Sequence, residues 1–187
     1  METVLILDFG AQYSQLIARR VREQNVYCEV KPCSISPDEI RELAPIGIIL
    51  SGGPQSVYES VSLHVDPALF SLGIPVLGIC YGCQLMAYSL GGTVAAATEA
   101  TAREYGKTLT EFDTHSAIFQ DLPASSVTWM SHGDYISRVP DGFTVTAKTA
   151  VCPTAAMACP EKRLYGVQFH PEVQHTVEGL SLIHISE

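Results

Sequence analysis

The sequence predicts an α/β fold: an open, mostly parallel sheet flanked by helices, with additional antiparallel strands in the C-terminal half. Short apolar runs alternate with helical patterns through the first half of the chain. Two of these runs, 47–54 and 74–80, are continuously apolar before they end in turn residues. Such runs are typical of parallel strands that helices cover on both faces. From Thr93 onward, strand and turn signals replace the helical patterns.

The first half contains the repeated strand and helix units. Ser36, Pro37 and Glu39 give the second helix an N-cap, a favoured first residue and the acidic member of a capping box. Gly91 and Gly92 end the helix after the fourth strand, as glycine does at helix C-termini. In chain order, the pattern predicts a strand over 4–10, a helix over 12–24, a strand over 26–30, a helix over 36–44, a strand over 47–50 that ends in the turn 51–54, a strand over 74–80 and a helix over 81–90.

The second half consists of short strand patterns separated by turn residues. We expect them to add hairpins and to close one edge of the sheet. The predicted segments are 94–100, 105–112, 126–132, 143–148, 155–160 and 164–171. Because no internal repeat, low-complexity tract or long linker divides the 187 residues, we expect one domain.

Composition and charge exclude several classes of protein. The chain is 47% hydrophobic and 17% charged, as in ordinary globular proteins. A formal net charge of −9 argues against nucleic-acid and anionic-membrane partners, which usually select a basic surface. The N-terminal apolar run lacks a basic flank and a cleavage site, and no run is long enough to span a membrane. We therefore expect a cytoplasmic protein with mostly reduced cysteines.

The stretch GICYGCQ, residues 78–84, joins the end of an apolar strand to the start of a helix. GICYG has the form of a nucleophile elbow, with Cys80 where a hydrolase would carry serine. A sharp turn leaves little room for side chains, and Gly78 and Gly82 keep that room free. The N-terminus of the helix favours a thiolate, so Cys80 is the candidate nucleophile.

Other interpretations of the cysteines stay open. Cys80 and Cys83 spell CxxC, which in a cytosolic strand and helix context can be a redox pair. A zinc site is not expected, because no second CxxC and no paired histidines accompany this one. Buried filling is the ordinary role of a cysteine in an apolar run. We expect it for Cys28, Cys33, Cys152 and Cys159.

A thiolate nucleophile needs a base, and His170 is the candidate among six histidines. Pro171 restricts His170 to extended geometry, so His170 and Glu172 can project toward the same side. The carboxylate can then orient the imidazole while the other ring nitrogen faces a nucleophile. His132, in the turn MSHGDY, could line a site or be structural. Four further histidines look like surface residues: His64, His115, His175 and His184.

The turn SGGP, residues 51–54, follows another predicted strand. It offers the backbone N–H groups of Gly52 and Gly53 to an oxyanion, and the amide of Tyr81 follows the nucleophile as an elbow requires. A plain loop is the alternative; no Lys-Ser/Thr follows, so it is not a Walker A loop. Gln84, one turn into the helix, could bind a small polar substrate or be a helix-surface residue.

Together these motifs resemble the class I, triad-type glutamine amidotransferase family, whose signature pairs GxCxGxQ with a downstream HPE. The resemblance extends over residues 3 to about 179. The stretches DFGAQYSQ and SGGPQSVY are most similar to the family members whose ammonia is used to convert XMP to GMP. Further matching stretches are 78–87, 131–134 and 166–176.

This resemblance implies a flavodoxin-like, amidotransferase fold and a set of roles. Cys80 would attack the glutamine carboxamide, His170 would pass a proton to the leaving ammonia, and Glu172 would hold His170. Gly53 and Tyr81 would supply the oxyanion hole. The residues implied to hold L-glutamine are Gln84, Ser131 and His132.

The resemblance also implies a partner. Ammonia would pass to an ATP-pyrophosphatase synthetase domain that aminates adenylylated XMP, and ATP and magnesium would bind there. No cofactor or metal is expected in this chain, which by itself could not make GMP. The family often has methionine where this chain has Cys83.

We expect the amidotransferase domain to comprise residues 1–179. Residues 180–187, with the sequence LSLIHISE, do not resemble the family and are expected to be an artefactual tail. The alternatives to a glutaminase are a stand-alone cysteine amidase or γ-glutamyl hydrolase of the same fold, a CxxC redox protein, and an inactive docking protein.

Overall fold

The structure, a computed structural model, describes residues 1–10, 14–53, 56–58, 64–96 and 104–172. In chain order its elements are β1 (Thr3–Asp8), α1 (Ser14–Glu23), β2 (Tyr27–Pro32), α2 (Pro37–Leu43), β3 (Gly47–Leu50), the 3-10 helix η1 (Pro67–Ser71), β4 (Val76–Ile79), α3 (Tyr81–Ser89), β5 (Thr93–Ala96), β6 (Glu104–Phe112), β7 (Ser125–His132), β8 (Asp134–Arg138), β9 (Thr144–Lys148), β10 (Ala156–Cys159), the 3-10 helix η3 (Pro160–Lys162) and β11 (Leu164–Val167).

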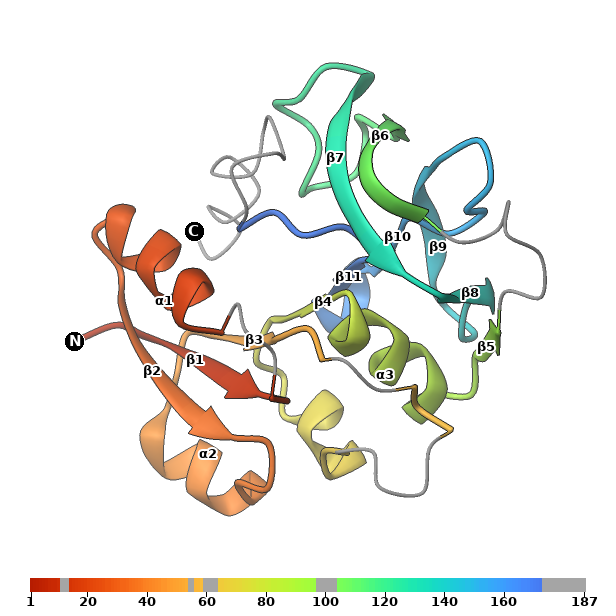
Figure 1. The fold of residues 1–187 in the computed structure, drawn as a ribbon. Coiled ribbons are helices and arrows are strands. Elements are labelled where there is room, and N and C mark those ends of the chain that lie inside the picture. The colour runs from red at the N-terminus through yellow and green to blue at the C-terminus, as the bar shows by residue number, and fades with distance from the viewer. Residues whose placement is uncertain (11–13, 54–55, 59–63, 97–103, 173–187) are drawn as a thin grey trace.

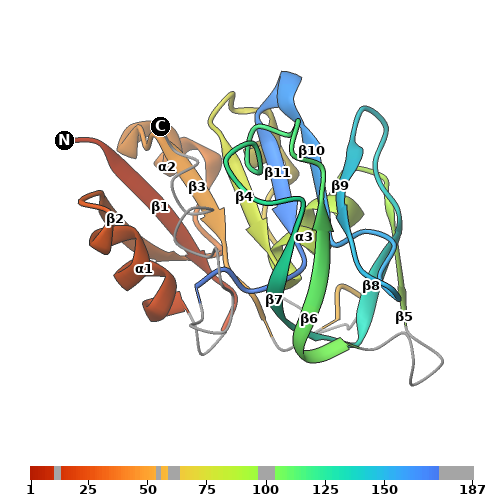
Figure 2. The same cartoon turned by 90° about the horizontal axis from the view of Figure 1, so that it is seen from above.

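Nine strands form one sheet in the order β2-β1-β3-β4-β11-β10-β9-β6-β7, and β5 pairs with β8 in a second, two-stranded ladder (Figure 1). The neighbours from β2 to β11 are parallel. The neighbours from β11 to β7 are antiparallel. Viewed from above, the parallel strands lie side by side and the antiparallel strands extend the sheet beyond β11 (Figure 2). The predicted α/β class, with antiparallel strands added by the C-terminal half, is confirmed.

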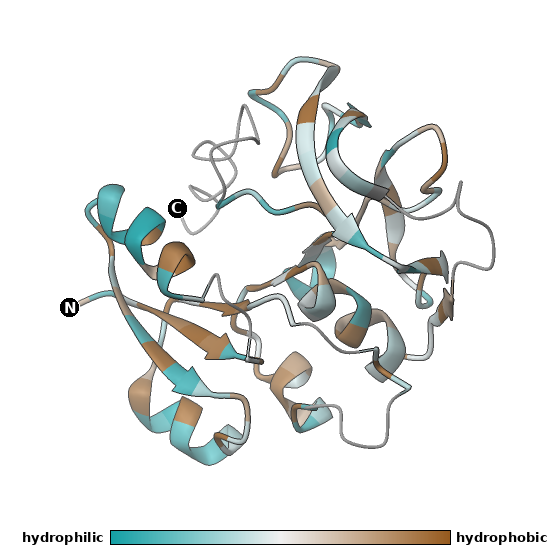
Figure 3. Cartoon of the chain, in the orientation of Figure 1, coloured by the Kyte–Doolittle hydropathy of each residue, from teal (hydrophilic) through white to brown (hydrophobic). Residues whose placement is uncertain are grey.

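The parallel strands are buried on both faces. On β1, Leu5 and Leu7 belong to a core covered by α2, η1 and α3, whereas Val4 and Ile6 belong to a second core under α1. Strand side chains alternate between the faces, so a strand buried on both sides must be apolar throughout. Figure 3 shows this: β1 and β3 are hydrophobic along most of their length, whereas α1 and α2 also carry hydrophilic residues.

The predicted helix ends agree with the structure. Ser36 Oγ accepts a hydrogen bond from the Glu39 N–H at 3.2 Å, and Pro37 begins α2. Gly91, just beyond the C-terminus of α3, has a φ of +92°, which glycine adopts at little cost. Within the described part of the chain, no helix is long and apolar enough to cross a bilayer.

The strand predicted before the turn 51–54 ends at Leu50, as expected, and the Ser51 hydroxyl accepts the Phe9 N–H at 3.2 Å. One difference from the predicted strands concerns the site: strand β8 was not predicted, since it follows β7 almost directly. The carboxyl ends of the neighbouring strands β3, β4 and β11 meet at one edge of the sheet, where residues 51–53, Cys80 and 168–172 follow. The predicted boundary between residues 179 and 180 lies outside the described residues and stays a prediction.

Candidate active site

Cys80 occupies a strained turn between β4 and α3. Its φ of 53° and ψ of −107° are unusual for a residue with a side chain. The Cys80 N–H donates to the Val167 carbonyl at 2.8 Å, which ties the turn to the end of β11. The side chain is 6% exposed. This is the strand, tight turn and helix geometry predicted for a nucleophile elbow.

The flanking glycines are required by space. A Cβ on Gly78 would lie 2.6 Å from the carbonyl oxygen of Gly82, and a Cβ on Gly82 would overlap the carbonyl oxygen of Leu50. Each of these neighbours is backbone, which cannot rotate away as a side chain can. The structure therefore confirms the predicted reason for both glycines.

His170 and Glu172 form a buried pair beside Cys80. Glu172 Oε1 lies 2.8 Å from His170 Nδ1, and the two side chains are 0% and 6% exposed. The backbone N–H of His170 donates to the Trp129 carbonyl at 2.9 Å, which fixes the segment against β7. Burial works against a charged imidazole, but hydrogen bonds to Cys80 and Glu172 and their negative charges outweigh it, and the pKa of His170 is raised to about 11. The charged imidazole therefore lies in contact with the Cys80 side chain.

The SGG turn lies beside these groups. A Cβ on Gly52 would stand 3.2 Å from His170 Cε1 and 3.7 Å from Cys80 Cβ, so the backbone of Gly52 borders the nucleophile. A Cβ on Gly53 would stand 3.3 Å from the ring of Tyr81. Tyr81 is itself buried and packs on Phe9 with ring centroids 5.4 Å apart. Gly53 and Tyr81 thus lie together near Cys80, and their oxyanion role stays a prediction.

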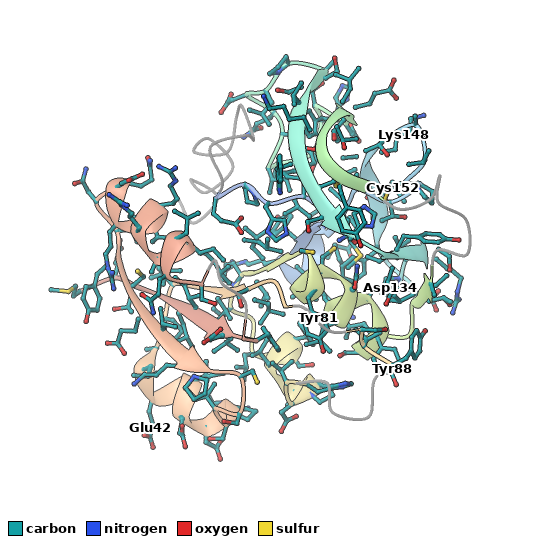
Figure 4. The ribbon with its side chains drawn as sticks, viewed as in Figure 1. Glu42, Tyr81, Tyr88, Asp134, Lys148 and Cys152 are labelled. Atoms are coloured by element: carbon teal, nitrogen blue, oxygen red, sulfur yellow. The ribbon has the colours of Figure 1, made fainter. Side chains whose placement is uncertain are left out.

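The SHGD turn also reaches the site. The carbonyl oxygen of Ser131 lies 3.6 Å from Cys80 Sγ, where the thiol donates to it. His132 is buried, with Nδ1 2.8 Å from the carbonyl oxygen of Asp134. Gln84 Nε2 donates to that same carbonyl at 3.1 Å (Figure 4, which labels Asp134 beside helix α3). The structure therefore brings Ser131, His132 and Gln84 to the site, and their contact with a substrate stays a prediction.

Two residues at the site were not predicted. Gln168 is fully buried, and its Nε2 donates to Cys80 Sγ at 3.5 Å. Arg20, on α1, donates from Nε to the backbone carbonyl of Glu172 at 3.0 Å. A signal for Gln168 was present in the sequence, because it stands two residues before His170 and successive odd or even positions of an extended chain share a face. No local signal points to Arg20.

The structure argues against a redox pair. Cys80 and Cys83 form no disulfide with each other. Cys83 is fully buried in the apolar core, and a Cβ on Gly166 would stand 2.6 Å from its sulfur. Burial raises the pKa of Cys83 well above its ordinary value, which disfavours the thiolate that disulfide exchange requires. The cysteines expected to be core fillers are all buried: Cys28, Cys33, Cys152 and Cys159.

Two of the four histidines expected at the surface lie among the described residues. His64 and His115 are exposed, as expected, whereas His175 and His184 lie outside the described residues. In the described ranges, no three metal-ligating side chains cluster. Cys80, His170 and Glu172 lie together at the strand ends, and their roles as nucleophile, base and orienting carboxylate stay a prediction.

Comparison with known proteins decides the family. The family model "Glutamine amidotransferase class-I" matches residues 5–186. The chain belongs to the class I glutamine amidotransferases. Within this family it is similar to proteins named GMP synthase [glutamine-hydrolyzing]. It is 57% identical over 182 residues to that of Clostridium botulinum strain Hall and 55% identical to that of Bacillus pumilus. Each alignment covers 97% of this chain but 35% of the relative, so the chain spans about a third of their length.

Solved structures of amidotransferases have the same fold. A Thermoplasma acidophilum protein, described as one subunit of a GMP synthase, superposes with a TM-score of 0.88 at 31% identity, covering 100% of this chain and 94% of that one. A glutamine amidotransferase of Thermotoga maritima gives a TM-score of 0.71 at 23% identity, with 92% and 76% of the chains covered. The amidotransferase fold expected from the sequence is confirmed.

Proposed function

We propose that this amidotransferase chain hydrolyses glutamine to glutamate and ammonia through a thioester on Cys80. The observation that supports it most directly is the strained elbow, which holds Cys80 in hydrogen-bonding contact with His170 while Glu172 lies 2.8 Å behind the imidazole. This arrangement supports the roles of nucleophile for Cys80, base for His170 and orienting carboxylate for Glu172 in acyl transfer.

In the first half-reaction, the Cys80 thiolate attacks the carbon of the glutamine carboxamide. A C–S bond forms and the carbonyl oxygen takes up the negative charge, which the N–H groups of Gly53 and Tyr81 would stabilise. As the intermediate collapses, the C–N bond breaks and the proton on His170 goes to the departing nitrogen. Ammonia leaves, and a γ-glutamyl thioester and a neutral imidazole remain.

In the second half-reaction, water releases the product. Neutral His170 takes a proton from a water molecule whose oxygen attacks the thioester carbon. The C–S bond then breaks, the sulfur leaves as a thiolate, and glutamate forms. The imidazole is protonated again, so the charge pair of the resting site is restored. Glu172 stabilises the imidazolium at both stages without exchanging a proton itself.

The use of the ammonia is proposed from the relatives. Their name, GMP synthase [glutamine-hydrolyzing], joins glutamine hydrolysis to GMP formation, and this chain matches 35% of their length. We propose that an ATP-pyrophosphatase synthetase domain receives the ammonia and converts XMP to GMP. ATP and magnesium would bind that domain, and the cytoplasm stays the expected compartment.

Glutamate release from glutamine tests the proposal. The purified 187-residue chain and a Cys80→Ala variant are assayed alone and with an added GMP synthase synthetase domain supplied with ATP, magnesium and XMP. We expect Cys80-dependent release that the loaded synthetase increases, because a partner can shift the site toward its active geometry. No release by the folded chain under either condition would contradict the proposal.

The choice of substrate distinguishes the proposed glutaminase from the alternative of a stand-alone hydrolase with the same fold. A stand-alone amidase or γ-glutamyl hydrolase would cleave γ-glutamyl peptides at least as fast as glutamine and would not respond to the synthetase. We expect glutamine to be the preferred substrate by the ratio of kcat/KM.

A further inference from the structure

Gln168 sits at the centre of the site with its whole side chain buried. It follows β11 directly, and its backbone N–H donates to the Ala155 carbonyl at 2.8 Å, so the residue is fixed by the sheet. Its side-chain amide spans the space between two other residues of the site. Oε1 accepts from Gln84 Nε2 at 3.0 Å, and Nε2 lies 3.5 Å from Cys80 Sγ.

The orientation of this amide follows from a backbone group. The Asp134 carbonyl can only accept a hydrogen bond, so the Gln84 atom 3.1 Å away from it must be the nitrogen. That same nitrogen lies 3.0 Å from Gln168, which must therefore present its oxygen. The remaining end of the Gln168 amide, facing the sulfur, is then the NH₂ group. A fixed acceptor on β8 thus determines that Cys80 faces a donor.

We propose that Gln168 is a catalytic residue whose amide N–H donates to the Cys80 thiolate and holds the sulfur ready for attack. The inference deepens the proposed function, since it concerns the nucleophile of the same reaction. A hydrogen bond to a charged group is stronger than one between neutral groups, so the donor stabilises the thiolate more than the thiol. Gln84 acts through Gln168 and is not proposed to contact the sulfur. It is a positioning residue, because its hydrogen bond to Gln168 Oε1 keeps the Gln168 NH₂ group turned toward the sulfur.

The contacts of the sulfur divide between its two protonation states. The Ser131 carbonyl, 3.6 Å from Cys80 Sγ, can accept from a thiol but offers nothing to a thiolate. Gln168 Nε2 and His170 can both donate to a thiolate. Among the described residues, the polar contacts of the sulfur thus include one acceptor, Ser131, and two donors, of which Gln168 is the neutral one. Because it carries no charge, Gln168 supports the thiolate without changing its own protonation state during the reaction.

Other titratable groups lie in the site, and substitution of Gln168 leaves their identities unchanged. His170 contacts Cys80, and Glu172 lies on the other side of that imidazole. His132, on β7, is next in sequence to Ser131, whose carbonyl contacts the sulfur. Within α3, Cys83 lies close enough to Cys80 for their charges to interact. Comparing variants at position 168 holds all of these constant.

The test measures the thiolate without any substrate. The rate of Cys80 alkylation by iodoacetamide is followed across pH by peptide mass spectrometry, and the ultraviolet absorbance of the thiolate, taken as wild type minus Cys80→Ala, gives the same midpoint without a reagent. For Gln168→Met, which keeps the length but cannot donate, we expect roughly tenfold slower alkylation at neutral pH and a midpoint moved to higher pH. Gln168→Glu, which keeps the shape and places an acceptor toward the sulfur, should move the midpoint at least as far.

The matched control is Thr146→Val, which removes a buried hydroxyl from β9 away from the site. It should leave both rate and midpoint at wild-type values. Midpoints for folded Gln168→Met or Gln168→Glu equal to that of wild type would overturn the inference and leave Gln168 a packing residue. Because no glutamine is used, failure here is distinguishable from failure of the glutaminase proposal, which glutamate release tests separately.

Discussion

Glu172 Oε1 lies 2.8 Å from His170 Nδ1 inside the protein, with one intervening proline. The carboxylate accepts a hydrogen bond from the Nδ1–H group, so the other ring nitrogen, Nε2, is the one available to Cys80. The second carboxylate oxygen, Oε2, has no hydrogen-bond partner among the described residues. Within the described part of the chain, the Glu172 carboxylate therefore bonds to His170, and its negative charge contributes to the raised pKa of that imidazole.

Removal of that charge should change the titration of His170. In wild type the pKa of His170 is raised from its ordinary value of 6.5 to about 11, so the imidazole keeps its proton at neutral pH. Glu172→Gln keeps a hydrogen-bond acceptor but loses the negative charge, so the pKa of His170 should fall and the ring should become neutral at a lower pH. Nitrogen chemical shifts of the labelled imidazole, measured across pH by NMR, check this. An unchanged midpoint would mean that Glu172 does not stabilise the imidazolium.

Arg20 should position Glu172 from outside the site. Its Nε donates to the Glu172 carbonyl at 3.0 Å, and its Nη1 pairs with Glu23 at 2.9 Å. For Arg20→Met we expect kcat for glutamate release to fall on the order of tenfold with little change in KM, because the carboxylate loses its fixed geometry.

The neighbouring residue Arg19 supplies the matched control. Its side chain is 77% exposed and contacts Glu23 at 3.8 Å. Arg19→Met should therefore leave kcat unchanged. Equal effects of the two substitutions would indicate a general effect of charge on α1 and not the contact with Glu172.

Gly82 should tolerate no side chain. Alanine ordinarily stabilises a helix relative to glycine by about 1 kcal/mol, so helix propensity alone predicts that Gly82→Ala raises stability. The Cβ would instead overlap the backbone of Leu50, and overpacking of this kind costs about 1–3 kcal/mol or more. We expect a net loss in the free energy of unfolding, measured by urea denaturation. A stabilised Gly82→Ala protein would show that the elbow is less closely packed than described.

Cys83 should be dispensable for chemistry. Cys83→Ser places a hydroxyl in the apolar core, which should lower the free energy of unfolding by about 1–3 kcal/mol. Glutamate release should remain Cys80-dependent and largely intact in the folded variant. The redox interpretation would instead be favoured if folded Cys83→Ser lost glutamate release and the wild-type protein catalysed disulfide exchange.

The sequence predicts those parts of the site whose causes are local. The elbow is determined by Gly78 and Gly82 around Cys80, and the histidine–carboxylate pair by the extended geometry that Pro171 imposes. The α/β class follows from apolar runs alternating with helical patterns. In each case a few adjacent residues carry the physical reason, so the pattern can be recognised without knowing the fold.

The parts that could not be predicted depend on distant residues. Gln84 and Gln168 meet across 84 residues of sequence, and Arg20 reaches the Glu172 carbonyl across 152. Such contacts exist only because β4 and β11 pair and α1 packs on the neighbouring strands β1 and β2. Gln84 illustrates the difference: its position at the site was predicted, but its hydrogen bonds to Gln168 and Asp134 follow from the tertiary structure.

Trapping of the acyl-enzyme tests the central claim most directly. The chain, with a synthetase domain supplied with ATP, magnesium and XMP, is mixed with isotopically labelled glutamine, quenched in acid and digested for mass spectrometry. We predict a labelled γ-glutamyl thioester on the peptide that contains Cys80, and none in Cys80→Ala. Glutamate release with the label on another residue, or undiminished release by Cys80→Ala, would contradict the assignment of Cys80 as the nucleophile.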